Sequence, residues 1–290
     1  MKLRDFINIK KQEEAGIHPI VESDVAPIEE YSAVVDIVTK FASQRDVIIN
    51  NSKITTLGDF FKIIGDQDLD LSSNNLKITR LYNLKSLGDM VPPSFSEIEI
   101  SACGLTDPNI IVMCDMFTIS ECHDLKSMDI GGHANSYIVS DCDGVESIRV
   151  ESYAEALLTV SKCRNLIKVD CGKDYIDELT ISDCKQLTEL KNITGDINAL
   201  IFEQDNGLPA KMDFTDIDKV LSVKSIVIQG DISHTEFEGL GSLLQINGLK
   251  SIQVDGLENE FEQVFKEPNY RKRVMMATQI LDRHNVKHSI

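Results

Sequence analysis

A short motif recurs through the middle of the chain and constrains its fold more than any other feature. The motif is Ile or Val followed by Ser, any residue and Cys. Its copies start at Ile100, Ile119, Val139, Val160 and Ile181, so successive starts are 19, 20, 21 and 21 residues apart. Self-similarity at such a period is typical of solenoids, in which each repeat forms one turn of a coil. We therefore expect a repeat solenoid with turns of about 20–21 residues.

Each motif lies within a longer frame, which is clearest in Ile176-x-x-Leu179-x-Ile181-x-x-Cys184-x-x-Leu187. The same frame recurs at Phe117, Ile119, Cys122 and Leu125, and at Leu158, Val160, Cys163 and Leu166. This frame resembles the leucine-rich repeat in its cysteine-containing form, LxxLxLxxCxxL, and its continuation is similar to BspA-like bacterial repeats. The resemblance implies a right-handed solenoid whose concave strand face commonly holds a ligand.

Apolar residues two positions apart indicate the local structure of each turn. Pairs such as Leu179 and Ile181, or Met128 and Ile130, place both side chains on one face of a short strand. These pairs alternate about every 9 to 11 residues, which predicts two short strands per turn. So short a turn leaves no room for a long helix, and we expect a mainly β solenoid.

The frame extends outward with weaker matches, which define three segments. We expect a solenoid over residues 47–257, an N-terminal segment over 1–46 and a C-terminal cap over 258–290. In the N-terminal part, Leu69 and Leu71 fit the frame, and Leu71 lies 29 residues before Ile100. The longer spacings predict inserts at residues 107–115 and 209–219.

Both ends of a solenoid must be covered, because no single repeat buries enough apolar surface to fold alone. Residues 27–41 have helical spacing with Pro27 in the first turn, which predicts a capping helix. Residues 258–266 and 269–283 predict two further helices, interrupted at Pro268.

Charge limits the class of partner. The formal net charge is -18, and residues 112–260 hold 27 acidic and 12 basic residues. Nucleic acids and anionic membranes are bound through Lys and Arg, so we expect neither as a direct partner. The sequence contains no apolar run of membrane-spanning length and does not begin like a signal peptide. We expect a cytoplasmic protein.

Seven cysteines raise the question of metal binding, but none forms the closely spaced pairs typical of zinc sites. One cysteine per turn predicts an inward-facing ladder of reduced thiols that fill the bend. The expected ladder is Cys103, Cys122, Cys142, Cys163 and Cys184. We expect no metal and no cofactor, and reduced thiols favour the cytosol.

The repeated Ser is not accompanied by a recurring His or carboxylate, so we interpret it as a structural hydroxyl and expect no enzyme activity. Gly131-Gly132 is interpreted as a turn between strands.

Two columns of residues are expected to point outward. The first-strand column is uncharged and consists of Thr118, Ile138, Thr159, Thr180, Ile201 and Val227. The second-strand column alternates in charge and consists of Asp129, Arg149, Asp170 and Lys191. An uncharged row near acidic residues resembles an interaction surface, although β-branched residues suit any strand.

These patterns favour a noncatalytic module that binds a protein partner on its strand face. The alternative is an acidic inhibitor that imitates DNA phosphates and blocks a nucleic-acid-binding enzyme. The bend row Glu121, Asp141, Lys162 and Asp183 is an imperfect phosphate mimic, because it contains a lysine.

Overall fold

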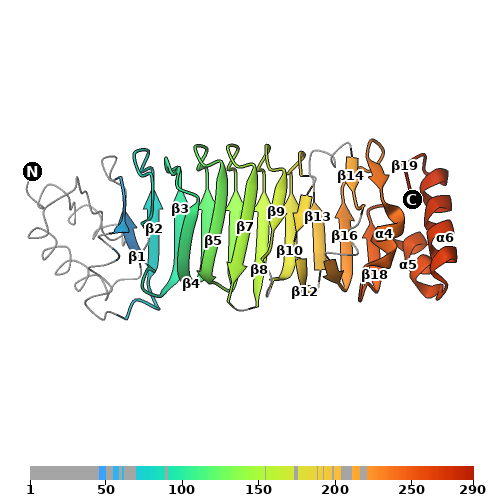
Figure 1. Ribbon diagram of the computed structural model, residues 1–290, viewed down its shortest axis with the longest axis horizontal. Helices are drawn as coiled ribbons and strands as arrows, with labels where there is room; N and C mark the ends of the chain where they lie inside the picture. The colour runs from blue at the N-terminus through green and yellow to red at the C-terminus, as the bar shows by residue number, and fades with distance from the viewer. Residues whose placement is uncertain are drawn as a thin grey trace, which may run out of the picture. The chain divides into compact units, whose positions relative to one another are not determined.

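The computed structural model describes residues 46–49, 55–58, 61, 70–88, 91–153, 155–172, 176–187, 189–191, 193–197, 199–203, 211–215 and 221–290. The chain divides into two compact units, Met1–Val145 and Glu146–Ile290. Parallel strands dominate the described part of each unit (Figure 1).

The first unit contains a row of parallel strands that pair in the order β1, β2, β3, β4 and β6. Their bounds are Asp46–Ile49, Asn75–Thr79, Phe95–Ser101, Asn109–Ser120 and Ser136–Ser140. Strand β5, Ser127–His133, pairs separately with the first half of β4. Strand β4 therefore belongs to both sheets of the unit.

Identical positions of successive strands form the core of this unit. One buried row consists of Leu76, Ile98, Phe117 and Tyr137, and a second of Ile78, Ile100, Ile119 and Val139. The rings of Phe117 and Tyr137 meet edge to face, with centroids 6.4 Å apart. The two rows lie two residues apart along each strand, so both face inward.

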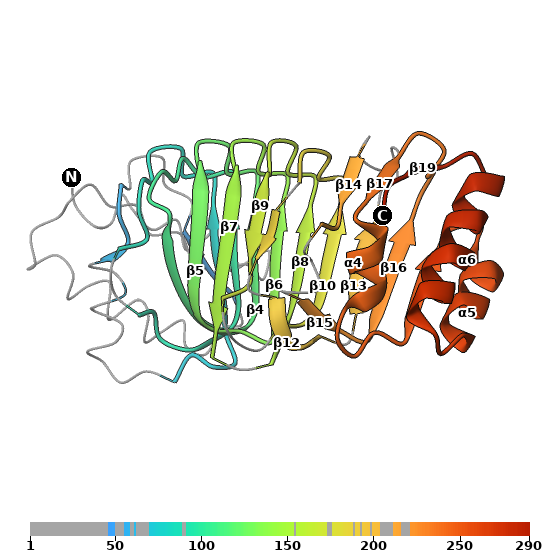
Figure 2. The ribbon, with the colours of Figure 1, turned by 45° about the vertical axis from the view of Figure 1, so that its right-hand side comes forward.

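The second unit contains two sets of stacked strands, which lie in two layers in Figure 2. The major sheet of this unit consists of β8 (Ala156–Ser161), β10 (Ile176–Ser182), β13 (Ala199–Glu203), β16 (Ser225–Gln229) and β18 (Ser251–Val254). Its minor sheet consists of β7 (Ser147–Ser152), β9 (Lys168–Asp170) and β11 (Glu189–Lys191).

All pairs within both sheets are parallel. Two buried rows cross the major sheet: Leu158, Leu179, Leu200, Ile226 and Ile252, and Val160, Ile181, Phe202, Ile228 and Val254.

Short strands supplement these sheets. Strand β12 (Ile193–Ile197) pairs with β15 (Leu221–Val223), and β17 (Glu236–Glu238) lies between β14 (Lys211–Asp213) and β19 (Lys287–His288). Since strands of the two sets alternate along the chain and pair in parallel, the prediction of a mainly β solenoid is confirmed.

A left-handed residue bends the chain after each motif strand. The third motif residue has φ of 53° or 54° in all five copies, at Ala102, Glu121, Asp141, Lys162 and Asp183. A non-glycine residue pays about 1 to 2 kcal/mol for this conformation. Stacking offsets the cost, because the backbone N–H of Glu121 donates to the Ser140 carbonyl of the following turn at 3.2 Å. The N–H of Lys162 donates in the same way to the Ser182 carbonyl at 2.9 Å.

Helices occupy the C-terminal part of the second unit. Helix α5, Glu258–Lys266, packs against β18, and α6, Tyr270–Arg283, packs against α4 and α5. Both lie close to the ranges predicted from sequence, and the Asn269 side chain caps α6 by accepting from the Lys272 N–H. Helix α4, Leu240–Gln245, was not predicted. None of the helices in the described part is long and apolar enough to span a membrane.

The helix predicted over residues 27–41 lies outside the described residues.

One predicted register is wrong. Ile100 pairs with Ile78, only 22 residues earlier, so Leu76 and Ile78 form the inward pair of that turn. Leu69 lies outside the described residues. Leu71 is buried but precedes the strand, where its carbonyl accepts from the Asn74 N–H in a tight turn. Leu71 fits the apolar pattern of a strand because it is a buried apolar residue, although it belongs to a turn.

Two further predictions are wrong because the residues concerned belong to strands. Residues 107–115 are not an insert, because the strand β4 already begins at Asn109. Gly131 and Gly132 do not form a turn, because both lie within β5. The predicted insert at 209–219 includes strand β14, and its other residues except 214 and 215 lie outside the described part.

Replacing Gly132 by Ala should destabilise the protein by about 3 kcal/mol. Gly132 has φ of 113°, and an added Cβ would lie 2.0 Å from the Val112 carbonyl oxygen. Gly131 is a matched control, because an added Cβ there meets no atom within 4 Å. Urea unfolding of both variants measures the difference, and equal stabilities would contradict the close approach of β5 to β4.

Candidate functional site

The uncharged column predicted from sequence forms a row on the major sheet of the second unit. Thr159, Thr180, Ile201 and Val227 are aligned by the registers of β8, β10, β13 and β16. All four side chains are partly exposed, and the row continues onto β18 at the exposed Gln253. We call these five residues the strand-face row.

The other two predicted residues, Thr118 and Ile138, are aligned with each other on β4 and β6 of the first unit. Both are partly exposed. Their row continues through Glu99 to Lys77, which form an ion pair at 3.8 Å. In the first unit the uncharged row is therefore short.

The strand-face row presents methyl, hydroxyl and amide groups, and none of its members is titratable. Beside it on β8, Leu157 is 46% exposed. Two serines on β16 and β18, Ser225 and Ser251, are also aligned, and their hydroxyl groups form a hydrogen bond at 3.1 Å. This surface is suited to contact and hydrogen bonding.

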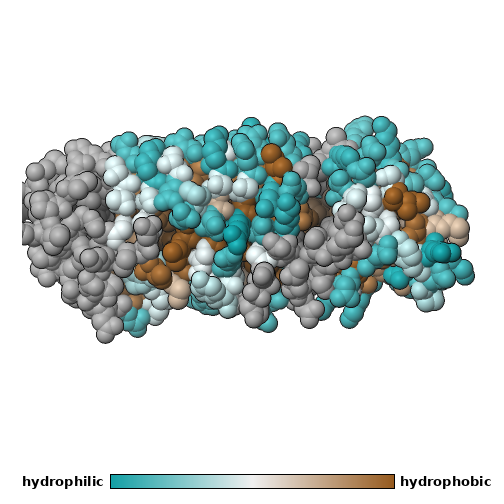
Figure 3. Space-filling model, viewed as in Figure 1, coloured by the Kyte–Doolittle hydropathy of each residue, from teal (hydrophilic) through white to brown (hydrophobic). Residues whose placement is uncertain are grey.

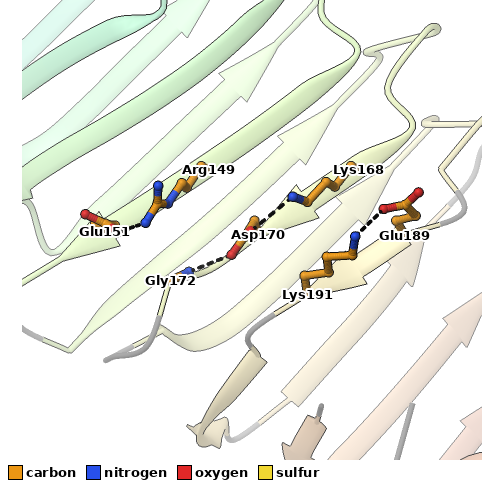
Figure 4. Close-up of polar contacts among 7 residues, drawn as sticks. All are labelled: Arg149, Glu151, Lys168, Asp170, Gly172, Glu189 and Lys191. Carbon is orange, nitrogen blue, oxygen red and sulfur yellow. Dashed lines mark hydrogen bonds and ion pairs between the residues drawn. The ribbon is translucent and has the colours of Figure 1, made fainter. Parts of the chain in front are cut away.

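The minor sheet presents a different surface, which Figure 4 shows. Its charged residues form ion pairs along each strand: Arg149 with Glu151, Lys168 with Asp170 at 3.2 Å, and Lys191 with Glu189 at 2.9 Å. The register also places Asp170 between Arg149 and Lys191 on the neighbouring strands. Each of these cations thus has an anion both along its strand and across it.

The ion pair of Lys191 and Glu189 shifts the pKa values of both groups toward their charged forms. The hydrogen bond with Lys191 lowers the pKa of Glu189, and the same contact raises the pKa of Lys191. Asp170 is buried and also accepts a hydrogen bond from the Gly172 N–H at 3.2 Å. It was expected on an outward column, and instead its lone pairs are used within the sheet.

The last predicted member of the charged column, Asp129, lies on β5 of the first unit opposite Asn109. It is partly exposed.

An open pocket lies where the strand-face row ends, and the sequence patterns did not predict it. It has a volume of about 490 Å³ and is bounded by β18 and α5. Strand β18 and the residue before it contribute Lys250, Ser251, Ile252 and Gln253; α5 contributes Glu258, Asn259, Glu262, Phe265 and Lys266. The pocket exists because α5 packs beside β18, and sequence spacing does not specify that packing.

The five ladder cysteines are buried, as are Cys114 and Cys171, and none of the seven forms a disulfide. The thiols of Cys103, Cys142, Cys163 and Cys184 each donate to the carbonyl of the serine two residues earlier, at 3.2–3.4 Å. Contact with the Cys103 thiol and burial raise the pKa of Cys122, and contact with the Cys163 thiol and burial raise that of Cys184. These thiols fill the bends.

Hydrophilic residues predominate along the upper edge of the face shown in Figure 3, where hydrophobic residues form only separate patches. Within the described part, no group of His, Cys, Asp and Glu residues is arranged to hold a metal ion.

The bend row considered as a phosphate mimic is unevenly exposed. Glu121 and Lys162 are exposed, whereas Asp141 and Asp183 are only partly exposed.

Comparisons with protein-family models, curated proteins and solved structures found no match to this chain. The site is therefore interpreted from its own geometry.

All five ladder thiols should react slowly with a thiol reagent in the native protein and rapidly after denaturation, because burial keeps them from solvent. Ellman's reagent with and without guanidinium, followed by mass spectrometry of labelled peptides, measures this. Rapid native labelling of Cys122 or Cys184 would contradict the inward ladder.

Replacement of Cys142 by Asp should lower the free energy of unfolding by several kcal/mol, because it buries a charge. Replacement of Cys142 by Ser should lower it by less.

Stability should decline between pH 9 and pH 12. Burial raises the pKa of Cys114 and of Cys171 to about 12, from an ordinary value of 9.0. Above pH 9 the unfolded chain loses these protons while the folded chain retains them, which favours unfolding by about 1.4 kcal/mol per pH unit and thiol. Denaturant unfolding at several pH values should show a shallower decline for Cys114→Ala and Cys171→Ala. An unchanged slope would argue against burial of these thiols.

Proposed function

We propose that this chain is a noncatalytic module that binds a protein partner on the major sheet of its second unit. The observation that supports this most directly is the strand-face row, which is uncharged, partly exposed and continuous across five paired strands. Such a row lets a partner bury apolar groups without desolvating charges.

The contrast between the two sheets supports the choice of face. On the minor sheet a partner would have to compete with existing ion pairs, such as those of Lys168 and Lys191. Surface ion pairs contribute little to stability, but they leave few charges to attract a specific partner. The major sheet offers Ile201, Val227 and the exposed Leu157 instead.

We further infer that the solenoid is of the leucine-rich-repeat type and that α5 and α6 cap it. The buried positions Leu179, Ile181 and Cys184 support the repeat type, because they occupy the framework positions of LxxLxLxxC. The contact of α5 with β18, the last strand of the major sheet, supports the capping role. Helix α5 also buries Phe261 and Val264. Seven cysteines without a disulfide suit a reducing compartment such as the cytoplasm.

The alternative of a DNA mimic remains a prediction without a geometric argument in its favour. A mimic requires regularly spaced exposed acids, whereas the bend row of the second unit places Lys162 next to Asp183. The affinity of a nucleic-acid-binding enzyme for such a mimic would fall steeply as salt is added, because exposed charges are screened over about 8 to 10 Å. Apolar contact would show little such dependence.

Replacing both Ile201 and Val227 by Glu should abolish partner binding and preserve the fold. The two side chains face away from the buried rows, and each change should cost over tenfold in affinity by placing a charge in an apolar contact. Wild type and variants are used as baits in lysate from the native cell, and each captured protein is then purified for affinity measurement across a salt series. Circular dichroism and thermal melting verify folding.

Arg149→Gln with Lys191→Gln is the matched control, because it changes net charge equally but on the minor sheet. A protein captured by wild type and control but lost from the Ile201→Glu/Val227→Glu variant supports the proposed face. A protein captured by wild type and by the Ile201→Glu/Val227→Glu variant but not by the control would show that the partner binds the minor sheet instead.

A further inference from the structure

We propose that the pocket between β18 and α5 receives a tryptophan side chain of the partner. This inference rests on the proposed function, because the pocket lies where the strand-face row ends at Gln253. It names the side chain that anchors a partner bound along that row, which the row itself does not specify.

The pocket has two walls. Ser251 and Gln253 lie two residues apart on β18, on the outer face of the major sheet that also carries the strand-face row. The opposite wall is one face of α5, on which Glu258, Glu262 and Phe265 recur at intervals of four and three residues. Helix α5 packs against β18 and lies beside it in Figure 1. A segment that follows the row toward β18 therefore meets α5 at its end.

The lining of the pocket carries no net charge. Its charged residues are two lysines and two glutamates, Lys250, Lys266, Glu258 and Glu262. Lys266 already pairs with Glu262 at 2.7 Å, and Glu258 accepts a hydrogen bond from the Gly256 N–H at 3.0 Å. A charged ligand would meet both signs of charge, so no net attraction would offset its loss of hydration. The balance of charge favours an uncharged side chain.

The ring of Phe265 favours an aromatic side chain among the uncharged ones. Phe265 is half-buried, and it contacts no other ring among the residues that the structure describes. Elsewhere in the same unit Phe214 contacts both Phe202 and Phe237, with ring centroids 6.3 and 6.2 Å apart. A pair of aromatic rings is more stable than its buried area alone accounts for. A ring of the partner on Phe265 would therefore bind more tightly than an aliphatic side chain.

Polar groups of the pocket favour tryptophan among the aromatic residues. The ammonium group of Lys250 forms no hydrogen bond or ion pair with any residue in the described part, and indole is the ring that attracts such a cation most strongly. The exposed amides of Gln253 and Asn259 also form no hydrogen bond within that part, and their carbonyl groups can accept from an indole N–H. A volume of about 490 Å³ is typical of pockets that hold whole small molecules, so it admits an indole ring.

The length of the strand-face row sets the size of the partner segment. Its five strands are separated by four intervals of about 4.8 Å, and the resulting 19 Å or so corresponds to about six extended residues. The residues before the tryptophan would lie along the row, over Val227 and Ile201.

The test uses the full chain and C-terminally amidated peptides labelled with fluorescein. Each peptide has six alternating Val and Thr residues followed by Trp, Leu, Ala, Glu or Lys. Fluorescence anisotropy should show that the Trp peptide binds about tenfold more tightly than the Ala peptide, with the Leu peptide between them. The Glu and Lys peptides should bind no more tightly than the Ala peptide. The chain contains no tryptophan, so the emission of an unlabelled Trp peptide should shift to shorter wavelength on binding without a background from the protein.

Two variants test the walls of the pocket. Phe265→Ala should reduce the preference for Trp over Ala to about twofold, and Lys250→Gln should weaken binding of the Trp peptide about threefold without affecting the Ala peptide. Gln263→Ala and Lys162→Gln are matched controls, because both residues are exposed and neither lines the pocket. Circular dichroism verifies folding, and Lys250→Gln tests an exposed residue even where Phe265→Ala unfolds α5.

A preference for Trp that persists in both pocket variants would overturn the proposal, as would tighter binding of the Glu or the Lys peptide. Equal binding of the Trp, Leu and Ala peptides, lost in Ile201→Glu/Val227→Glu, would overturn it and leave the proposed function intact. Absence of binding by every peptide would also overturn it, while lysate capture still tests the proposed function.

Discussion

Parallel pairing in register between successive turns imposes the main constraint on this molecule. A strand can join the stack only if its two inward residues meet the inward residues of the strand before it. In the second unit this places Leu158, Leu179 and Leu200 in one buried row. The bend must then return the chain at the same height in every turn, and the left-handed residue at positions such as Lys162 and Asp183 does so. A cysteine after that residue is small enough to turn inward, where its thiol donates to a serine carbonyl.

The same constraint explains why the outward faces differ so much. Inward positions are committed to packing, so only outward positions can vary without disturbing the stack. On the minor sheet they hold charges that pair along and across the strands, as Lys168 and Asp170 do. On the major sheet they hold Thr180, Ile201 and Val227, which gain little from one another beyond strand propensity. A surface that contributes little to its own fold is available for a partner, and the pocket at its end supplies the aromatic ring that the row lacks.

Sequence reasoning succeeded where one period governed the chain. The motif predicted the strands around Ile119, Val160 and Ile181, their inward pairs and the burial of the cysteines. It failed where burial arises without a strand, as at Leu71, and where glycines continue a strand, as at Gly131 and Gly132. Residue type alone does not distinguish these cases, because only the position of a neighbouring backbone does. Four residues of the strand-face row were predicted from sequence and Gln253 was not. The pocket was not predicted either, since it depends on how α5 packs against β18.

The unequal lengths of the two sheets in the second unit have a mechanical consequence. Strands β9 and β11 of the minor sheet have three residues each, whereas β8 and β10 of the major sheet have six and seven. Tension applied across the strands, in the direction of stacking, is carried by the hydrogen bonds between neighbouring strands, and a pair of longer strands shares it among more bonds. The side with fewer bonds per strand therefore separates first, and the longer strands act as a hinge. We therefore expect the second unit to bend toward its major sheet under load, and a partner bound across that sheet to resist the bending.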